Sequence, residues 1–281
     1  MSFADDQTIQ EQVKTEFEAA GFAIAPNVLD ADTVSALRDR LKALYYKEVN
    51  LKEAPLDAHR LQIWRHQEGG EASFLHIAEI PEVAGILKNK KLMTAFAKCV
   101  GATHLQSFEA VALIKPTSQD QVFAWHSDYP LFPYQTQDYA TLWIAVTECN
   151  EETGGMSMAK TSFKHDWSPV NVKSGAIIEN NRSGETPPDN PEAQGMPVSR
   201  IDMAPGDAVI FHANTLHKSE ANTSPDLRIG LAMRFALRPI QLDEGKEPIQ
   251  AAFTKQVEWD SEGFLKNTKA LPVIWPNEWQ S

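Results

Sequence analysis

Cysteine, positive charge and long hydrophobic runs are all scarce in this chain of 281 residues. Its two cysteines, Cys99 and Cys149, are too few for a disulfide framework or a cysteine-rich zinc site. No apolar run approaches the roughly 18 residues of a membrane span, and the first residues lack the basic and apolar regions of a secretion signal. We therefore expect a cytoplasmic protein that does not insert into a membrane.

The formal net charge of −12 disfavours two classes of partner, nucleic acids and anionic membrane surfaces. It also disfavours a polyanionic substrate such as an acyl-CoA. Hydrophobic residues make up 42% of the chain, which is ordinary for a globular protein with a sizeable core. The expected partner is a small-molecule substrate, and the sequence leaves the oligomeric state open.

Helical periodicity dominates the first hundred residues. Ile9, Val13 and Phe17 recur at helical spacing and are followed by Gly21, a typical helix stop. Similar patterns predict helices over residues 7–20, from Asp30 or Asp32 to about 49, and over 81–101, with a short strand over 22–28. Residues 50–80 show no clear periodicity. We interpret residues 1–104 as a mainly helical support.

Short apolar or alternating runs separated by Gly, Pro, Asn and Asp follow residue 105. They predict strands near 107–115, 121–127, 140–148, 155–159, 172–180, 197–203, 207–212, 216–221 and 227–237. Many short strands at this spacing are typical of a jelly roll. We predict a single domain over 1–281: a mainly β fold with a double-stranded β-helix (cupin-like jelly roll) core over 105–237, buttressed by the N-terminal helices, and a C-terminal packing segment over 238–281. The polar, proline-rich segment 180–197 is interpreted as a lid.

A metal-ligand pattern stands at the end of one predicted strand, in Trp125-His126-Ser127-Asp128-Tyr129. Side chains two residues apart on a strand point to the same face, so His126 and Asp128 can meet at one point. With 8 His and 38 acidic residues, about one His-x-Asp/Glu pair is expected by chance. The pair therefore needs a third ligand.

The third ligand is sought between residues 204 and 235. A polar segment after an apolar strand brings in His217, and His212, which directly follows that strand, is the rival histidine. The last strand alternates Arg228, Gly230, Ala232 and Arg234 with Ile229, Leu231, Met233 and Phe235, so the aliphatic set should face a helix layer and the other set the interior. An inward arginine is costly unless an anion meets it. Arg228 is the preferred anchor, and Arg234 the runner-up or a partner in a salt bridge.

These motifs together resemble the phytanoyl-CoA dioxygenase (PhyH-like) family of Fe(II)/2-oxoglutarate oxygenases. The matching pieces are Lys115-Pro116, Trp125-His126-Ser127-Asp128, Leu142-Trp143-Ile144 and His217-x-Ser219-x-x-Asn222-x-Ser224-x-x-x-Arg228. Two histidines and one carboxylate on one face of a metal are the ligand set of non-heme Fe(II) oxygenases. One departure is Lys160-Thr161-Ser162-Phe163-Lys164-His165, where relatives tend to read Pro-Gly-Ser-His-Lys.

The resemblance implies roles for individual residues. His126, Asp128 and His217 would bind Fe(II) and form the catalytic centre, and Arg228 would hold 2-oxoglutarate with help from Ser219 and Trp143. Because halogenating relatives lack the carboxylate, Asp128 argues against halogenation. The implied function is a hydroxylase that uses O2, releases succinate and CO2, and takes ascorbate as its in vitro reductant.

Two other readings stay open, and the substrate contacts are hypotheses. A cupin-like isomerase or binding protein without redox activity, or a zinc hydrolase, would use similar ligands but would leave Arg228 unexplained. Glu109 shares a predicted strand face with Lys115 and is expected either to contact a hydroxyl or cationic group of the substrate or to pair with Lys115 or Arg234. Tyr129 and Tyr134 are candidate pocket walls. The sequence does not identify the small metabolite or natural-product intermediate that would be oxidised.

Overall fold

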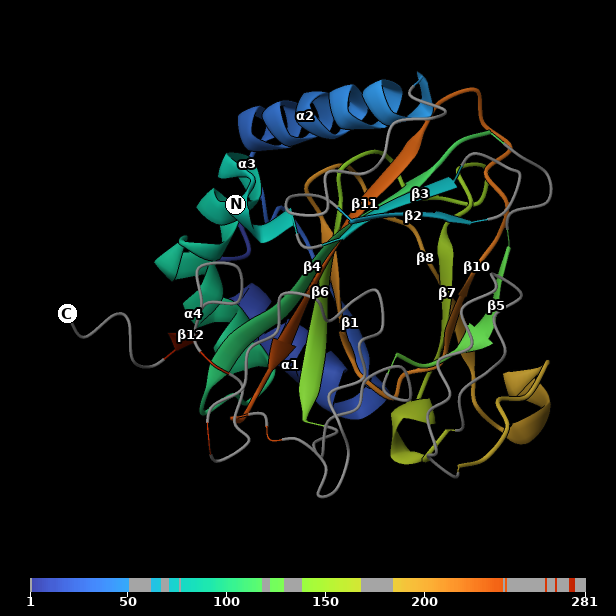
Figure 1. Ribbon diagram of the computed structural model, residues 1–281. Helices are drawn as coiled ribbons and strands as arrows, with labels where there is room; N and C mark the ends of the chain where they lie inside the picture. The colour runs from blue at the N-terminus through green and yellow to red at the C-terminus, as the bar shows by residue number, and fades with distance from the viewer. Residues whose placement is uncertain are drawn as a thin grey trace.

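Two antiparallel β-sheets form the centre of the molecule (Figure 1). The computed structural model describes residues 2–50, 62–66, 71–75, 77–117, 122–128, 138–167, 184–239 and 273–275, together with residues 241, 261 and 266. The larger sheet has the strand order β1-β9-β6-β11-β4-β3-β2, with β12 also paired to β4, and the smaller has the order β5-β10-β7-β8. Strands distant in sequence are thus hydrogen-bonded neighbours, as in the expected jelly roll.

The strand bounds follow the predicted runs closely from residue 105 onward. The larger sheet contains β1 (Phe22–Ala25), β2 (Gln62–His66), β3 (Glu71–Leu75), β4 (Leu105–Lys115), β6 (Tyr139–Ala145), β9 (Ala208–His212), β11 (Arg228–Ala236) and β12 (Val273–Trp275). The smaller contains β5 (Phe123–His126), β7 (Met156–Ala159), β8 (Val198–Ile201) and β10 (His217–Ser219). The predicted strand 172–180 lies outside the described residues.

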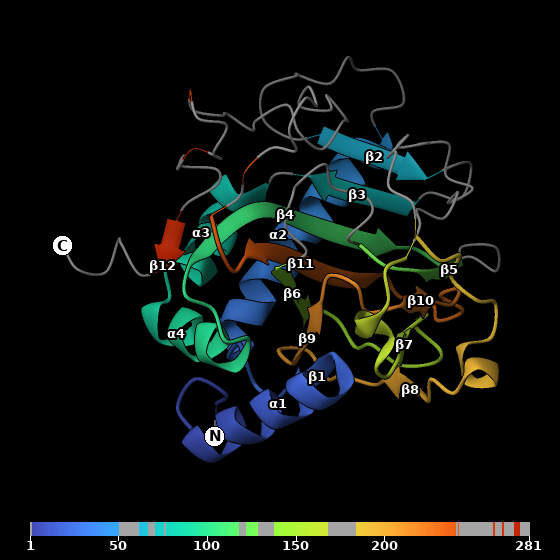
Figure 2. The ribbon, with the colours of Figure 1, turned by 90° about the horizontal axis from the view of Figure 1, so that it is seen from below.

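Four helices cover the outer face of the larger sheet: α1 (Gln7–Ala20), α2 (Ala31–Asn50), α3 (Pro81–Leu87) and α4 (Lys90–Cys99). Figure 2 shows α1 and α4 on the side of this sheet that faces away from β5, β7, β8 and β10. Gly21 ends α1 with φ of 88°, a left-handed conformation that favours glycine, and its N–H bonds to the Phe17 carbonyl. The single helix predicted over 81–101 is wrong in one respect: it is two helices, because the Asn89 side chain caps α4 by accepting from the Leu92 N–H at 3.1 Å.

Strand alternation separates two apolar layers. Ile229, Leu231, Met233 and Phe235 of β11 pack with the helices in the main hydrophobic cluster, as their parity predicts. On the opposite face, Ala232 belongs to a second cluster with Trp143 and Phe211, between the two sheets. The inner face of β11, and hence Arg228 and Arg234, therefore points between the sheets.

The first hundred residues contain more strand than predicted. β1 pairs with β9, and the β2–β3 hairpin extends the larger sheet beside β4. The short runs of β2 and β3 lack the period that would have revealed them. At the other end of the chain β12 pairs with β4, so this part of the C-terminal segment joins the sheet. Within the described parts of the chain, no helix combines the length and apolar character needed to cross a membrane.

Candidate metal and cosubstrate site

Three predicted ligands meet between the two sheets. Candidate ligand atoms of His126, Asp128 and His217 all lie within 4.8 Å of one another. His126 ends β5 and His217 begins β10, and the antiparallel pairing of these strands places the two residues directly opposite. Their ring centroids are 4.2 Å apart, and His217 Nε2 lies 3.8 Å from Asp128 Oδ1. The cross-strand pair of His126 and His217, together with Asp128 just after β5, thus forms a compact group of two imidazoles and a carboxylate.

Backbone carbonyls orient both imidazoles. His126 Nδ1 lies 2.8 Å from the Ala124 carbonyl and His217 Nδ1 lies 3.0 Å from the Thr215 carbonyl. A carbonyl only accepts, so each Nδ1 donates a proton, and Nε2 is the ring nitrogen of each histidine that can face a metal. Burial lowers the pKa of His217 to about 4, which keeps this ring neutral at physiological pH. Neutral imidazoles fixed through the other ring nitrogen are the usual form of metal-binding histidines.

Asp128 is held by an arginine on the adjoining wall. Its Oδ2 accepts bonds from Arg234 Nε at 3.0 Å and from the neighbouring Nη2 at 2.9 Å. Arg234 also donates to Glu109 Oε2, as the salt-bridge alternative predicted. Burial raises the pKa of the Asp128 carboxyl, but Arg234, His217 and His126 together outweigh this effect, and the pKa lies below its usual value. Asp128 is therefore an anion, with Oδ2 on Arg234 and Oδ1 beside His217.

A second group of polar residues lies on the same inner wall, at the start of β11. Arg228 is 3% exposed, its guanidinium lies 5.5 Å from the centre of the Trp143 ring, and its register partner on β4 is Lys115. Lys115 Nζ donates to Ser219 Oγ at 3.0 Å. The buried cationic side chains of Arg228 and Lys115 and the hydroxyl of Ser219, two residues after His217, thus lie in the same part of this wall. No site role for Lys115 was predicted from the sequence.

The loop between His217 and Arg228 is fixed by the polar residues of the motif. The Asn222 amide donates to the Lys115 carbonyl at 2.9 Å and to the Asp226 carbonyl at 2.7 Å. The Ser224 hydroxyl donates to Asn222 Oδ1 at 2.7 Å. Asn222 and Ser224 therefore hold the loop against the end of β4, which sets the spacing between the His217 ligand and the Arg228 side chain.

Other expectations for the site have mixed outcomes. His212 lies outside the three-residue group and contacts Phe163, so His217 is the histidine that joins His126. No open space lies beside Gly230 on this inner face, because a Cβ built there would lie 1.9 Å from Trp143 Cζ2 and the ring fills the space. Tyr129 and Tyr134 lie outside the described residues.

The segment interpreted as a lid is described from residue 184 onward. Asn190 caps a single 3-10 turn, Pro191–Gln194. Met196 packs with Trp125, the residue before His126, in a small apolar cluster. This segment therefore lies beside the strand that carries a predicted ligand, and its role as a lid stays a prediction.

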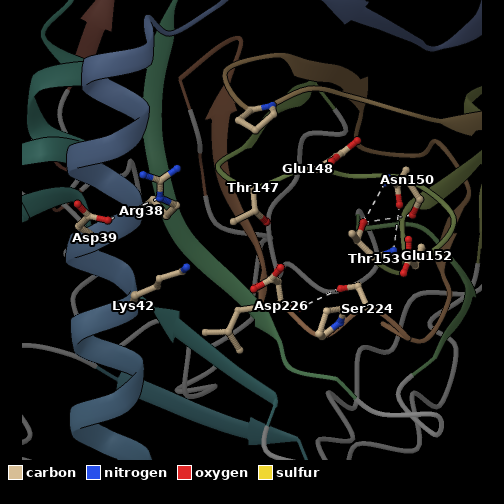
Figure 3. Close-up of a pocket in the computed structure, with 13 residues that line it drawn as sticks. Arg38, Asp39, Lys42, Thr147, Glu148, Asn150, Glu152, Thr153, Ser224 and Asp226 are labelled. Atoms are coloured by element: carbon tan, nitrogen blue, oxygen red, sulfur yellow. Dashed lines mark hydrogen bonds and ion pairs between the residues drawn. The ribbon is translucent and has the colours of Figure 1, made fainter.

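A polar groove of about 550 Å³ lies elsewhere, between α2 and the loops after β6 and before β11 (Figure 3). Its walls carry groups of both charges, including Arg38, Lys42, Glu152 and Asp226. None of the predicted ligands or cosubstrate residues lines it, so the metal-ligand group is a separate feature.

The family model of phytanoyl-CoA dioxygenase (PhyH) matches residues 17–230. This span includes β5 and β10, which carry His126 and His217, and it also includes Arg228. The chain belongs to the phytanoyl-CoA dioxygenase family. Two relatives of this family member, uncharacterized proteins from Mycobacterium bovis and Mycobacterium tuberculosis, are each 29% identical over 131 residues. The match covers 45% of this chain and 45% of each relative, which is less than half their length.

Solved structures confirm the jelly-roll fold of this phytanoyl-CoA dioxygenase family member. The 2-oxoglutarate-dependent epimerase SnoN from nogalamycin biosynthesis aligns with a TM-score of 0.70 at 18% identity, over 97% of this chain and 98% of that one. The carbocyclase SnoK gives 0.70 at 18% identity, over 98% of both chains. EctD from S. alaskensis, with 2-oxoglutarate and 5-hydroxyectoine, gives 0.65 at 17% identity, over 87% and 83%.

The described residues fit the cofactor and cosubstrate of this family, Fe(II) and 2-oxoglutarate. Two imidazoles and one carboxylate are a donor set that suits Fe(II). Trp143 Nε1 is buried and has no hydrogen-bond partner among the described residues, although it lies on the wall that carries Arg228. A buried donor of this kind is expected to have a partner, and a bound carboxylate would supply one. The described site thus fits the metal and the cosubstrate of this family.

Proposed function

We propose that this protein hydroxylates a small metabolite or natural-product intermediate, consuming 2-oxoglutarate and O2 and releasing succinate and CO2. The observation that carries the proposal is one arrangement: His126, Asp128 and His217 face each other beside a buried wall that bears Arg228. Iron supplies the activation of O2 in this chemistry, while the chain orients the reactants and excludes water.

In this proposal the three clustered side chains are the iron ligands. Both imidazoles present Nε2, because their Nδ1 atoms are held by backbone carbonyls. Asp128 contributes Oδ1, the oxygen beside His217. The carboxylate occupies the position that a halide would need, so hydroxylation is preferred to halogenation.

Arg228, Ser219 and Trp143 are assigned to the cosubstrate. The Arg228 guanidinium offers a planar pair of donors that matches the distal carboxylate of 2-oxoglutarate. Ser219 Oγ accepts from Lys115, so the hydroxyl proton remains for donation to the same carboxylate. The Trp143 indole lies against Arg228 and forms the floor of this region.

Glu109 is assigned to the substrate. Its Oε2 is bonded to Arg234, whereas its Oε1 is buried and has no hydrogen-bond partner within the described chain. A carboxylate oxygen accepts only, so the substrate should present a hydroxyl or ammonium donor there. Tyr129 and Tyr134 are retained as pocket walls on sequence grounds. The acidic net charge favours a small substrate over an acyl-CoA.

The test is turnover with Fe(II), ascorbate and 2-oxoglutarate across a panel of hydroxyl- and amine-bearing metabolites. We expect succinate to form in proportion to a product that has gained one oxygen atom, labelled when 18O2 is supplied. A product with no added oxygen, formed with matching succinate, would exclude hydroxylation but retain the oxygenase. Product without 2-oxoglutarate consumption would favour the non-redox isomerase, for which Arg228 has no purpose.

A further inference from the structure

Arg234 lies between two buried carboxylates, one of which is a proposed metal ligand. Its Nε and Nη2 both bond to Asp128 Oδ2, at 3.0 and 2.9 Å, while its Nη1 bonds to Glu109 Oε2. The side chains of both acids are 2% exposed and that of Arg234 is 14% exposed. Each of the three guanidinium nitrogens therefore bonds to one of these two acids.

In this arrangement the two oxygens of the Asp128 carboxylate have different neighbours. Oδ2 accepts two charge-assisted bonds from Arg234, whereas Oδ1 faces His217 Nε2 at 3.8 Å. A carboxylate free to rotate could present both oxygens to a metal or turn away from it. We propose that Arg234 is a positioning residue that fixes Asp128 as a one-oxygen metal ligand, and that Glu109 holds Arg234 in place.

The strand register places Glu109 and Arg234 next to each other. Glu109 on β4 and Arg234 on β11 are direct cross-strand partners, and the pairing shifts immediately after them, between Arg234 and Phe235. The shift interrupts the regular ladder next to this pair, and the pairing resumes with Phe235 opposite Ser107. A lysine in place of Arg234 would keep the charge but could not send a planar fork to both acids at once.

The proposal rests on the assignment of His126, Asp128 and His217 as metal ligands, and Co(II) alone is a suitable probe. Co(II) binding is measured by titration without 2-oxoglutarate or substrate, and the visible absorption bands report the ligand geometry. The main variant is Arg234→Lys. The double variant Arg234→Met/Glu109→Gln removes one positive and one negative charge, so it loses the contact without changing the net charge.

We expect both variants to bind Co(II) about 10- to 100-fold more weakly than the wild type and with altered visible bands, the usual effect of removing a partner that orients a metal ligand. Thr141→Val is the matched control, because Thr141 is the other cross-strand partner of Arg234 and is fully buried. This control should keep the wild-type affinity and spectrum.

The outcomes separate this inference from the proposed function. If the wild type itself fails to bind Co(II), or if His217→Ala binds it equally well, the proposed metal site fails. If the wild type binds and a folded Arg234 variant has an affinity within twofold of it and an unchanged spectrum, the positioning role is overturned. A lower melting temperature with unchanged Co(II) binding shows a purely structural ion pair and also overturns it; either variant alone decides the matter.

Discussion

Gly230 offers the sharpest test of the wall that carries Arg228. A Cβ built at this residue would lie 1.9 Å from Cζ2 of Trp143 and 2.5 Å from its Cε2 and Cη2, where ordinary contacts begin at 3.4 Å. The Trp143 ring would have to move by about 1.5 Å, yet it is 2% exposed and packed in the cluster between the sheets. Glycine is needed here for space, because the extended backbone of β11 suits any residue.

Gly230→Ala should therefore destabilise the protein and weaken 2-oxoglutarate binding. Overpacking a well-filled core costs about 1–3 kcal/mol, and a rigid ring places this case near 3. The melting temperature should fall by about 6–12 °C at roughly 2–4 °C per kcal/mol. Because the displaced ring also contacts Arg228, affinity for 2-oxoglutarate should fall about tenfold, or about 1.4 kcal/mol.

The assay is thermal unfolding together with titration of 2-oxoglutarate into the Co(II)-loaded protein. Gly85→Ala is the control, since no atom lies within 4 Å of a Cβ built at Gly85 in α3. Removing a helical glycine should raise stability by about 0.5–1 kcal/mol and leave the ligand titration unchanged. If Gly230→Ala instead melts with the wild type and binds 2-oxoglutarate equally well, the placement of Trp143 over Gly230 is wrong.

Four further outcomes follow from the site and the core. Arg228→Gln should raise the KM for 2-oxoglutarate at least about 100-fold, as loss of a charged bidentate contact of roughly 3 kcal/mol requires, and an unchanged KM would remove the anchor assignment. His217→Ala should abolish Co(II) binding while His212→Gln preserves it; the reverse result in a titration would reassign the ligand. Glu109→Gln keeps an oxygen that can accept from Arg234, so at saturating metal it should raise the KM for substrate and leave 2-oxoglutarate affinity unchanged, a contrast that steady-state kinetics can disprove. Burial raises the pKa of Cys99 from 9.0 to about 12, so the thiol keeps its proton to higher pH in the folded state than in the unfolded state. The free energy of unfolding should therefore fall as pH rises from about 9 to 12. Cys99→Ala should reduce this fall in denaturant titrations, and a fall of equal size in the variant would exclude the thiol as its cause.

Periodicity predicted the elements best where one face is buried in an apolar layer. The alternation in β11 correctly assigned Ile229 and Leu231 to the helix side and Arg228 to the interior, because a strand has only two faces. The hairpin of β2 and β3 was missed, since its five-residue strands show no strong alternation. The break at Asn89 was also missed, although an asparagine followed by a new apolar run is a helix-start signal.

Motif spacing predicted the group that the structure assembles at the site. His126 and His217 are 91 residues apart, yet they face each other because β5 and β10 pair in this register. The functions of these residues remain proposals, but the structure places them close together, as the motif predicted. Lys115 was part of the matching motif, but no local pattern indicated that its side chain would reach Ser219, 104 residues away.

The sequence alone determined three features: a jelly roll supported by helices, a candidate ligand set of two histidines and one carboxylate, and an inward-facing arginine. These follow from local rules, since residue type and a period of two decide which face a side chain takes. Only the tertiary structure decided which of two inward arginines contacts Asp128, and that Trp143 fills the space above Gly230. The physical reason is that such contacts depend on strand register and sheet packing, which bring together atoms that no local pattern relates.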